Sequence, residues 1–238
     1  MKIFLEKYLD TNITILRDDK LKGGSKSRFV NKLINKKYNY VYCSPRCGGF
    51  QIALATQTKK NIKIVIFTPY SMELHPCTKE AKDLGAEIKQ IKGGYMTNLV
   101  SKSKKYVEEK KLLGEKWEII EIGGNCDIAI NSISNTMKKC IKKLGYEPDE
   151  IWCAIGSGTL CRGILKGTKK AKVIGVQVGK EVEIKHPRLY KYKYHKKFNL
   201  KSRIKVNFKS NPHYDLKAFE YCLEKSNKNK KILFWNVL

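Results

Sequence analysis

A lysine directly after a glycine-rich turn is the clearest sign of chemistry in this sequence. Lys26 follows the turn Gly23–Ser25 and precedes an apolar pattern over residues 29–34 that is typical of a helix, for which Ser25 is the expected N-cap. The positive end of a helix dipole would favour the neutral, nucleophilic form of an amine placed there. The alternative is that Lys26, like Lys20 and Lys22 before the glycines, is a surface lysine in a lysine-rich chain.

Two more glycine-rich turns follow apolar, strand-like segments. They are SPRCGG at 44–49 and GSGTL at 156–160, and the second leads into an apolar helical pattern. Bare backbone amides, two hydroxyls and a helix N-terminus make the second turn a candidate anion site. It lacks both the GK[ST] ending of a Walker A loop and the GxGxxG spacing of a dinucleotide turn. The alternative is that its glycines serve only the tight turn.

The elements that must position these turns alternate along the chain. We expect strands at 39–43, 62–68, 86–91, 117–122, 151–155 and 172–178, with helices between them and a closing helix (216–225) and strand (231–235). This alternation predicts an α/β fold with a parallel, doubly wound sheet. Its ligand site should lie at the carboxyl ends of the strands.

Two of the expected helices carry clear end signals. A long helix after Gly93-Gly94 should place Leu99, Tyr106 and Leu113 on one apolar stripe. The next helix is expected to be capped by Asp127 and to end at Gly145.

The composition limits the class of protein. The chain has 238 residues, of which 42% are hydrophobic, enough for one large domain or two small ones. No apolar run approaches the roughly 18 residues that a membrane span needs, and Glu6 and Lys7 interrupt the apolar N-terminus, making it a poor signal peptide. Eight scattered cysteines, with no pairs or Cys/His clusters at zinc spacing, predict free thiols in the cytoplasm and no metal site.

In their order along the chain, these parts resemble the tryptophan-synthase-β-like (fold type II) pyridoxal-phosphate enzymes. The nearest branch is that of aminocyclopropane-carboxylate deaminase and D-cysteine desulfhydrase. The resemblance covers about residues 14–180 and includes the LGAEI turn (84–88) and the IGG turn (122–124). It implies two parallel-sheet, three-layer αβα subdomains: a larger cofactor-binding domain of residues 1–38 and 136–238, and a smaller inserted domain of residues 39–135. It also implies a homodimer.

The same resemblance implies roles for individual residues. Lys26 matches the lysine that carries pyridoxal 5'-phosphate as a Schiff base and then moves protons at the substrate Cα. The turn that starts at Gly156 matches the loop that holds the cofactor phosphate. Residues with an implied cofactor-binding role are Ser25, Ser44, Cys47, Gly48, Gly49, Gly156, Ser157, Gly158, Thr159 and Asn236.

Two of these positions depart from the family pattern. Cys47 stands where an asparagine usually contacts the phenolic oxygen of the cofactor. The family usually places a serine or threonine near the C-terminus against the pyridine nitrogen, and here Asn236 is the nearest polar candidate. The expected function is that of a lyase, deaminase or decarboxylase acting at Cα or Cβ of an amino acid. A non-catalytic binding protein with the same fold is one alternative.

The net charge of +27 favours anionic partners, although an AT-rich genome would also produce many lysines. The charge is dense over residues 180–209, where aromatic residues alternate with cations; on a strand the two kinds would face opposite sides. One interpretation is a solvated surface strand. The other is a nucleic-acid platform, which would suit a viral DNA-hypermodification enzyme in a host cytoplasm, acting on an amino-acid group attached to a nucleobase. The candidate contact residues are Lys191, Lys193, Lys196, Lys197, Tyr190, Tyr192 and Tyr194.

Overall fold

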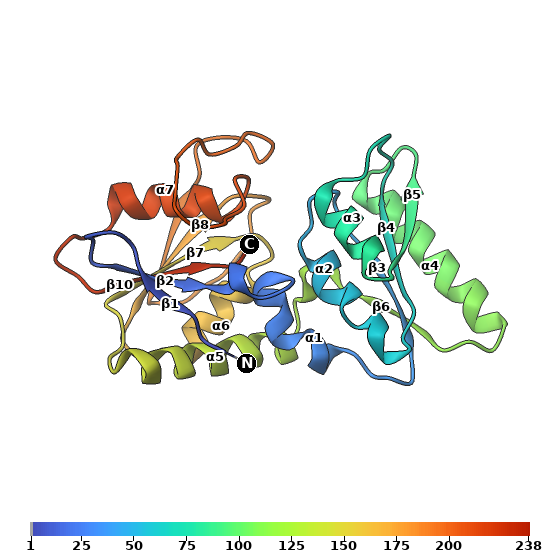
Figure 1. Ribbon diagram of the computed structural model, residues 1–238, viewed down its shortest axis with the longest axis horizontal. Helices are drawn as coiled ribbons and strands as arrows, with labels where there is room; N and C mark the ends of the chain where they lie inside the picture. Colours follow the sequence, from blue (N-terminus) through green and yellow to red (C-terminus); the bar gives the residue numbers. More distant parts are fainter. Residues whose placement is uncertain (1) are drawn as a thin grey trace. The chain divides into compact units, whose positions relative to one another are not determined.

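The computed structural model describes residues 2–238, which divide into two compact units (Figure 1). Unit 1 runs to Phe29 and resumes at Asn125, and unit 2 is the continuous segment Val30–Gly124. Both divisions lie earlier in the chain than the expected 38/39 and 135/136.

Unit 2 is built on a four-stranded sheet of order β5-β4-β3-β6, in which all three pairings are parallel. Between the strands lie helices α2, α3 and α4 and the 3₁₀ turn η3, and a second 3₁₀ turn, η4, ends the unit. The elements are α1 (Ser27–Leu33), which begins in unit 1, β3 (Asn39–Cys43), α2 (Phe50–Ala55), η3 (Thr58–Lys60), β4 (Ile64–Pro69), α3 (Pro76–Asp83), β5 (Glu87–Ile91), α4 (Met96–Leu112), β6 (Trp117–Ile120) and η4 (Ile122–Gly124).

The core of unit 2 lies between the sheet and α4. Val65 and Phe67 alternate along β4 and pack with Leu99 and Val107 of α4 and with Trp117 of β6. The apolar stripe expected for α4 is wrong at its last position. Leu113 is 73% exposed because it follows the helix as its C-cap.

Unit 1 contains a six-stranded sheet of order β1-β2-β10-β7-β8-β9. Every pairing is parallel except the antiparallel pair β1 and β2, so the parallel sheet predicted from the sequence is confirmed apart from this edge. The strands are β1 (Leu5–Lys7), β2 (Ile13–Arg17), β7 (Glu150–Ile155), β8 (Lys172–Gln177), β9 (Leu189–Lys193) and β10 (Ile232–Asn236).

Helices cover both faces of this sheet, with α7 (Asp215–Lys225) on one side and α5 (Asp127–Leu144) and α6 (Thr159–Gly167) on the other (Figure 1). Two 3₁₀ turns, η1 (Asp18–Lys20) and η2 (Gly24–Lys26), follow β2. The core beneath α7 joins Trp152 of β7, Val176 of β8 and Phe234 of β10 to Phe219. The predicted α/β class with parallel sheets is therefore confirmed.

Two helix ends test the capping signals in the sequence. Gly145, with φ 77°, ends α5 as predicted, in the left-handed conformation that glycine adopts at little cost. Asp127 is the first residue of α5 rather than its N-cap, which is Cys126. No described helix has the length and apolarity to cross a membrane. All eight cysteines are free thiols, as predicted.

Candidate active site

Lys26 is the last residue of η2 and lies directly before α1. Its ammonium group lies 5.5 Å from the centre of the Phe29 ring. Burial lowers the pKa of Lys26 from its ordinary 10.5 to about 8, and the nearby Cys126 opposes this shift. Removal from water disfavours a charged amine, so this lysine gives up its proton more easily than a surface lysine does. This is the property that a nucleophilic amine requires.

A buried ion pair fixes the turn that carries Lys26. The Asp18 carboxylate is fully buried and accepts a hydrogen bond from Arg28 Nε at 2.7 Å, with a second bond from the same guanidinium. Ser25 Oγ donates to the same carboxylate at 2.6 Å, and Trp235 Nε1 donates to it at 3.0 Å. The predicted N-cap role of Ser25 is wrong, because its hydroxyl satisfies Asp18 and the N-cap of η2 is Gly23.

The chain after β10 presses against the same turn. Ser25 N donates to the Val237 carbonyl at 3.1 Å. Gly24 has φ 62°, and a Cβ atom on it would lie 2.1 Å from the Val237 carbonyl oxygen. Glycine is therefore required here both by the left-handed backbone and by the close approach of a second chain segment.

The predicted anion loop forms the joint between β7 and α6. Gly158 is the N-cap of α6, with φ 85°, and no side chain caps the helix. Ser157 Oγ and Thr159 Oγ1 lie 3.0 Å apart, and Thr159 Oγ1 donates to the Asn125 amide oxygen at 3.2 Å. Arg162 Nη1 donates to the Ser157 carbonyl at 3.1 Å and adds positive charge to the loop. Uncapped helix N–H groups, hydroxyls and a cation suit a phosphate.

A tyrosine and a carboxyl group that the sequence had not singled out lie in the same unit. A Cβ atom on Gly156 would come within 2.8 Å of Tyr214 Oη, so the phenol packs against the anion loop. Asp215, the next residue, is fully buried. Its Oδ2 accepts from Leu238 N at 2.7 Å, but its Oδ1 has no hydrogen-bond partner among the described residues. Burial is the main cause that raises the pKa of Asp215 to about 8; the nearby Asp19 and Asp18 act in the same direction, and backbone N–H groups of Leu238 and Val237 oppose it.

Asn236, the predicted partner of the pyridine nitrogen, is fully buried and bonded to protein groups. Its Nδ2 donates to Asp19 Oδ1 and to the Lys209 carbonyl, both at 2.8 Å, and its Oδ1 accepts from Ser210 Oγ at 2.8 Å. Both amide hydrogens are thus used inside the protein. Asp215, with its unpartnered oxygen, is the better candidate for that contact.

The predicted cofactor residues of unit 2 lie in the loop between β3 and α2. Ser44 is buried, and its Oγ donates to the Pro45 carbonyl at 2.9 Å. A Cβ atom on Gly48 would lie 2.3 Å from Ser44 Oγ, so this glycine permits the tight loop. Burial raises the pKa of the Cys47 thiol, which keeps it protonated. Gly49 is the N-cap of α2.

The basic and aromatic residues of 190–197 divide between packing and solvent. Tyr192 stacks on Trp152 with ring centres 5.9 Å apart, and Tyr194 is buried and donates to Glu220 at 2.6 Å. Tyr190 is 50% exposed. Lys191 lies on the opposite side of β9, where its ammonium donates to the Val182 carbonyl, in keeping with the predicted alternation. Three of the four lysines of this set are exposed and Lys196 is half-buried, the exposed ones being Lys191, Lys193 and Lys197.

The groups that sequence reasoning missed share one property: their partners lie far along the chain. Asp18 meets Trp235 across 217 positions, and Tyr214 meets Gly156 through the packing of α7 on the sheet. The only local signal was the pair Asp18-Asp19, which stands in the same stretch as the GGSK turn.

The residues of unit 1 fit pyridoxal 5'-phosphate on three observations. Lys26 supplies an amine with a lowered pKa. The turn at Gly158 supplies an uncapped helix N-terminus for a phosphate. Asp215 Oδ1 is a buried oxygen with no hydrogen-bond partner among residues 2–238. A phosphorylated, carbonyl-bearing heterocycle has complementary groups for all three.

Comparisons with known proteins agree with this fit at the level of the fold. No family model and no curated protein sequence matches the chain. A solved structure described as an aminocyclopropane-carboxylate (ACC) deaminase homologue is similar over 100% of this chain and 89% of its own, with TM-score 0.82 and 18% identity. A hydrogen sulfide-producing enzyme from Fusobacterium nucleatum matches over 99% and 92%, with TM-score 0.75 and 16% identity.

An O-acetyl serine sulfhydrylase from Entamoeba histolytica is also similar, over 99% of this chain and 84% of its own, with TM-score 0.71 and 12% identity. These neighbours have the fold type II architecture of pyridoxal-phosphate enzymes, and this chain shares it. The resemblance seen in the sequence is therefore confirmed for the fold.

Proposed function

We propose that this protein is a pyridoxal-phosphate-dependent enzyme that acts at Cα or Cβ of a small amino acid, of the lyase or deaminase type, with Lys26 as the attachment residue. The observation that carries the proposal is the lowered pKa of Lys26, about 8, in a chain whose neighbours in fold act on amino acids or make them. Pyridoxal phosphate, when bound, supplies an electron sink next to the α-carbon of an amine substrate.

The residues of this chain would divide the work as follows. Lys26 would hold the cofactor through Nζ and, once the substrate amine has replaced it, carry a proton to or from Cα. The amides and hydroxyls of Gly156, Ser157, Gly158 and Thr159 would hold the phosphate, with Arg162 adding charge. Asp215 would face the heterocycle nitrogen, a contact for which the sequence alone suggested Asn236.

The cofactor residues predicted in unit 2 lie in the loop between β3 and α2. Ser44, Cys47, Gly48 and Gly49 stay predicted cofactor contacts. Cys47 holds its proton because burial raises its pKa, so it can donate a weak hydrogen bond but not act as a thiolate. Ser25 is committed to Asp18 and Trp235 and would act by positioning the turn rather than by contact with the cofactor.

Attachment can be tested by trapping. Purified protein would be incubated with pyridoxal phosphate, reduced with cyanoborohydride and mapped by peptide mass spectrometry across a pH series. We expect Lys26 to carry the adduct, with labelling that rises with pH to a midpoint near 8 rather than near the ordinary lysine value of 10.5. The neutral fraction of Lys26 at pH 7 should exceed that of a surface lysine roughly 100-fold or more.

Two variants control this experiment. Lys26→Ala should lose the adduct and any visible absorption band of the bound cofactor, whereas Lys22→Ala, in the same turn region, should keep both. Equal labelling of Lys26 and exposed lysines at all pH values would argue against the assignment. Substrates would then be screened among amino acids with a leaving group on Cβ, with release of sulfide, ammonia or a keto acid as the readout.

A second candidate is the same chemistry on an amino-acid group attached to a nucleobase. The exposed Lys191, Lys193 and Lys197 and the half-exposed ring of Tyr190 favour it. The ring of Tyr194 does not, because it is buried; the ring of Tyr192 is 39% exposed but stacks on Trp152. DNA binding that weakens steeply with salt would support this candidate, and weak binding independent of salt would contradict it. A homodimer stays a prediction, to be checked by light scattering.

A further inference from the structure

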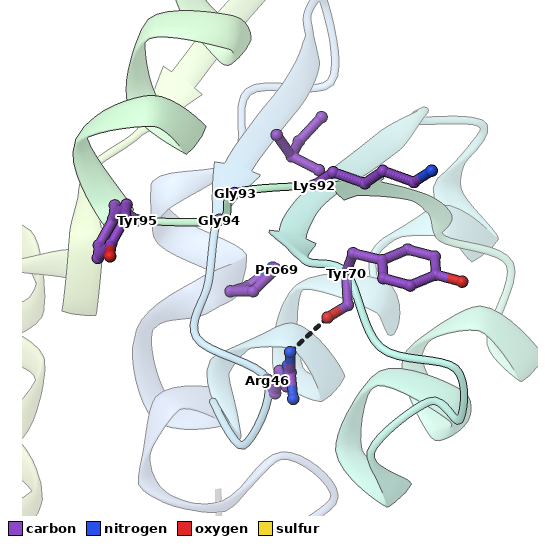
Figure 2. Close-up of a pocket in the computed structure, with 8 residues that line it drawn as sticks. Arg46, Pro69, Tyr70, Lys92, Gly93, Gly94 and Tyr95 are labelled. Atoms are coloured by element: carbon purple, nitrogen blue, oxygen red, sulfur yellow. Dashed lines mark hydrogen bonds between the residues drawn. The ribbon is translucent and has the colours of Figure 1, made fainter.

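An open cavity of about 400 Å³ lies in unit 2 at the carboxyl ends of β4 and β5 (Figure 2). This volume falls within the range of small-molecule sites, about 300–1,000 Å³. Carboxyl ends of parallel strands are where open α/β sheets bind ligands. The residues that line it include Arg46, Tyr70, Lys92, Gly93, Gly94 and Tyr95.

Two cations and no acidic residue line this cavity. Neither Arg46 nor Lys92 forms an ion pair with another described residue of the chain. Glu73 is the acidic residue closest to Tyr70 in the sequence, and it is not among the lining residues. The cavity is therefore an electropositive concavity, which attracts anions.

One hydrogen bond anchors the guanidinium of Arg46, and two others fix its backbone carbonyl. Its Nη2 donates to the Tyr70 carbonyl, which Figure 2 shows as a dashed line. The backbone carbonyl of Arg46 accepts a hydrogen bond from Thr78 Oγ1 at 3.1 Å and another from Gln51 Nε2 at 3.3 Å. One N–H of the guanidinium is thereby used, and the others are available to an oxygen-rich ligand.

The opposite wall is a glycine turn that leads into α4. Lys92-Gly93-Gly94 connects β5 to Tyr95, the N-cap of α4, whose side chain makes no capping hydrogen bond. The first turn of this 17-residue helix contains no acidic residue. The positive end of the helix thus adds to the field of the two cations. Gly93, with φ 63°, has open space where a Cβ atom would stand, so backbone is exposed there.

Aromatic surface borders the same cavity. Tyr95 is 81% exposed and Tyr70 is 45% exposed, and the ammonium of Lys92 lies 5.9 Å from the centre of the Tyr70 ring. Met72, two residues after Tyr70, is 94% exposed. Exposed flat rings next to anion-binding groups are the combination that holds a nucleobase beside its phosphate.

We propose that this cavity binds a nucleoside phosphate, with the phosphate between Arg46 and Lys92 and the base against Tyr70 or Tyr95. The site is built only from residues of unit 2 and uses neither Lys26 nor the Gly156–Thr159 loop. The phosphate could belong to a free nucleotide or to the terminus of a nucleic acid, since both present the same ester.

The test is titration calorimetry of the full-length protein with adenosine 5'-monophosphate (AMP), adenosine, inorganic phosphate and a short 5'-phosphorylated oligothymidylate. We expect AMP to bind more tightly than adenosine or phosphate. Arg46→Gln and Lys92→Gln should each weaken AMP binding about tenfold or more, as expected for loss of a charged contact. If the natural ligand is the terminus of a nucleic acid, the oligonucleotide should bind more tightly than AMP. Arg46→Gln and Lys92→Gln should then weaken oligonucleotide binding to the same extent.

Two control variants separate this site from surface charge and from the proposed active site. Lys89→Gln removes a β5 lysine that is already paired with Glu87 and should bind AMP normally. Lys26→Ala should also bind AMP normally, so AMP binding at this site does not depend on whether Lys26 carries a cofactor. Thermal unfolding would confirm that each variant is folded. Equal AMP affinity in Arg46→Gln, Lys92→Gln and Lys89→Gln, or no AMP binding at all, would overturn the proposal.

Discussion

The GGSK turn of unit 1 and the KGG turn of unit 2 are both glycine-rich turns that lead into a helix and carry a lysine, yet they are built in opposite ways. At the first, Asp18, Arg28, Ser25 and Trp235 are buried and bonded to one another. At the second, Lys92 borders an open cavity and has no ion-pair partner among the described residues.

This difference separates two kinds of site. A buried, fully bonded network fixes the turn that carries one amine, and the amine's own burial lowers its pKa; covalent chemistry needs both. An open electropositive cavity leaves its cationic side chains in contact with water, which suits reversible binding of an anion. The polar groups at the GGSK turn should therefore contribute to folding, whereas Lys92 at the KGG turn should contribute to binding alone.

The largest expected effect comes from breaking the buried network. Asp18→Ala leaves the Arg28 guanidinium buried without its carboxylate and should cost about 3–5 kcal/mol of unfolding free energy. Urea denaturation followed by tryptophan fluorescence would measure it, since Trp235 donates to Asp18 directly. The matched control is Glu87→Ala, which breaks the exposed pair with Lys89 and should cost less than about 1 kcal/mol. Similar losses in both would remove the contrast.

Two glycines with nearly the same backbone angle give the next test. Gly24 has φ 62° and Gly93 has φ 63°. Gly93→Ala meets open space and should cost about 1 kcal/mol for the left-handed conformation alone. Gly24→Ala adds a clash with the Val237 carbonyl and should cost roughly 3 kcal/mol. Equal melting temperatures for the two variants would show that the chain at Val237 moves away from the added methyl group at no cost in stability.

The buried carboxyl of Asp215 gives a pH-dependent test. Its folded pKa, about 8, lies above the ordinary value of 3.8, so the folded state binds a proton that the unfolded state has lost. The stability of the wild type should therefore fall as pH rises from about 4 to 8, at up to about 1.4 kcal/mol per pH unit from this group. Asp215→Asn cannot titrate and should lose this component, so its stability relative to the wild type should improve with rising pH. A constant difference between the two proteins would contradict the buried, neutral carboxyl.

The smallest effect should be that of Lys92→Gln on folding. Its ammonium is exposed and contacts only the Tyr70 ring among the interactions described. The unfolding free energy should change by less than about 0.5 kcal/mol, although ligand binding falls. A loss above about 2 kcal/mol in the same urea experiment would place Lys92 with the folding network instead.

The helices and strands could be predicted from the sequence because their signals are local. The strand expected at 39–43 is β3, and the helix expected to end at Gly145 is α5. The spacing of apolar residues and the glycines that end helices are patterns among residues a few positions apart. The same patterns gave the order of strands and helices from which the fold was inferred.

The site was only half readable, because its positioning contacts are long-range. Lys26 and the turn at Gly158 carry local signatures, but nothing near Ser25 reveals that its hydroxyl bonds to Asp18 rather than capping a helix. The burial of Asp215, and with it the raised pKa, follows from the packing of α7 and of the chain after β10. Charge was also a poor guide: of the tyrosines in the basic stretch, Tyr194 is buried in the core, and Tyr192, although 39% exposed, stacks on Trp152.

The position of β10 has a consequence for biosynthesis. This strand lies between β2 and β7 and pairs with both in parallel, yet it is encoded more than 70 residues after β7. On the ribosome, the sheet of unit 1 therefore stays in two separate halves until residues 232–236 have emerged. Unit 2, whose four strands come from one continuous segment, can fold well before that. The turn that carries Lys26 is translated early, but its contacts with Trp235 and Val237 can form only after the last strand has emerged.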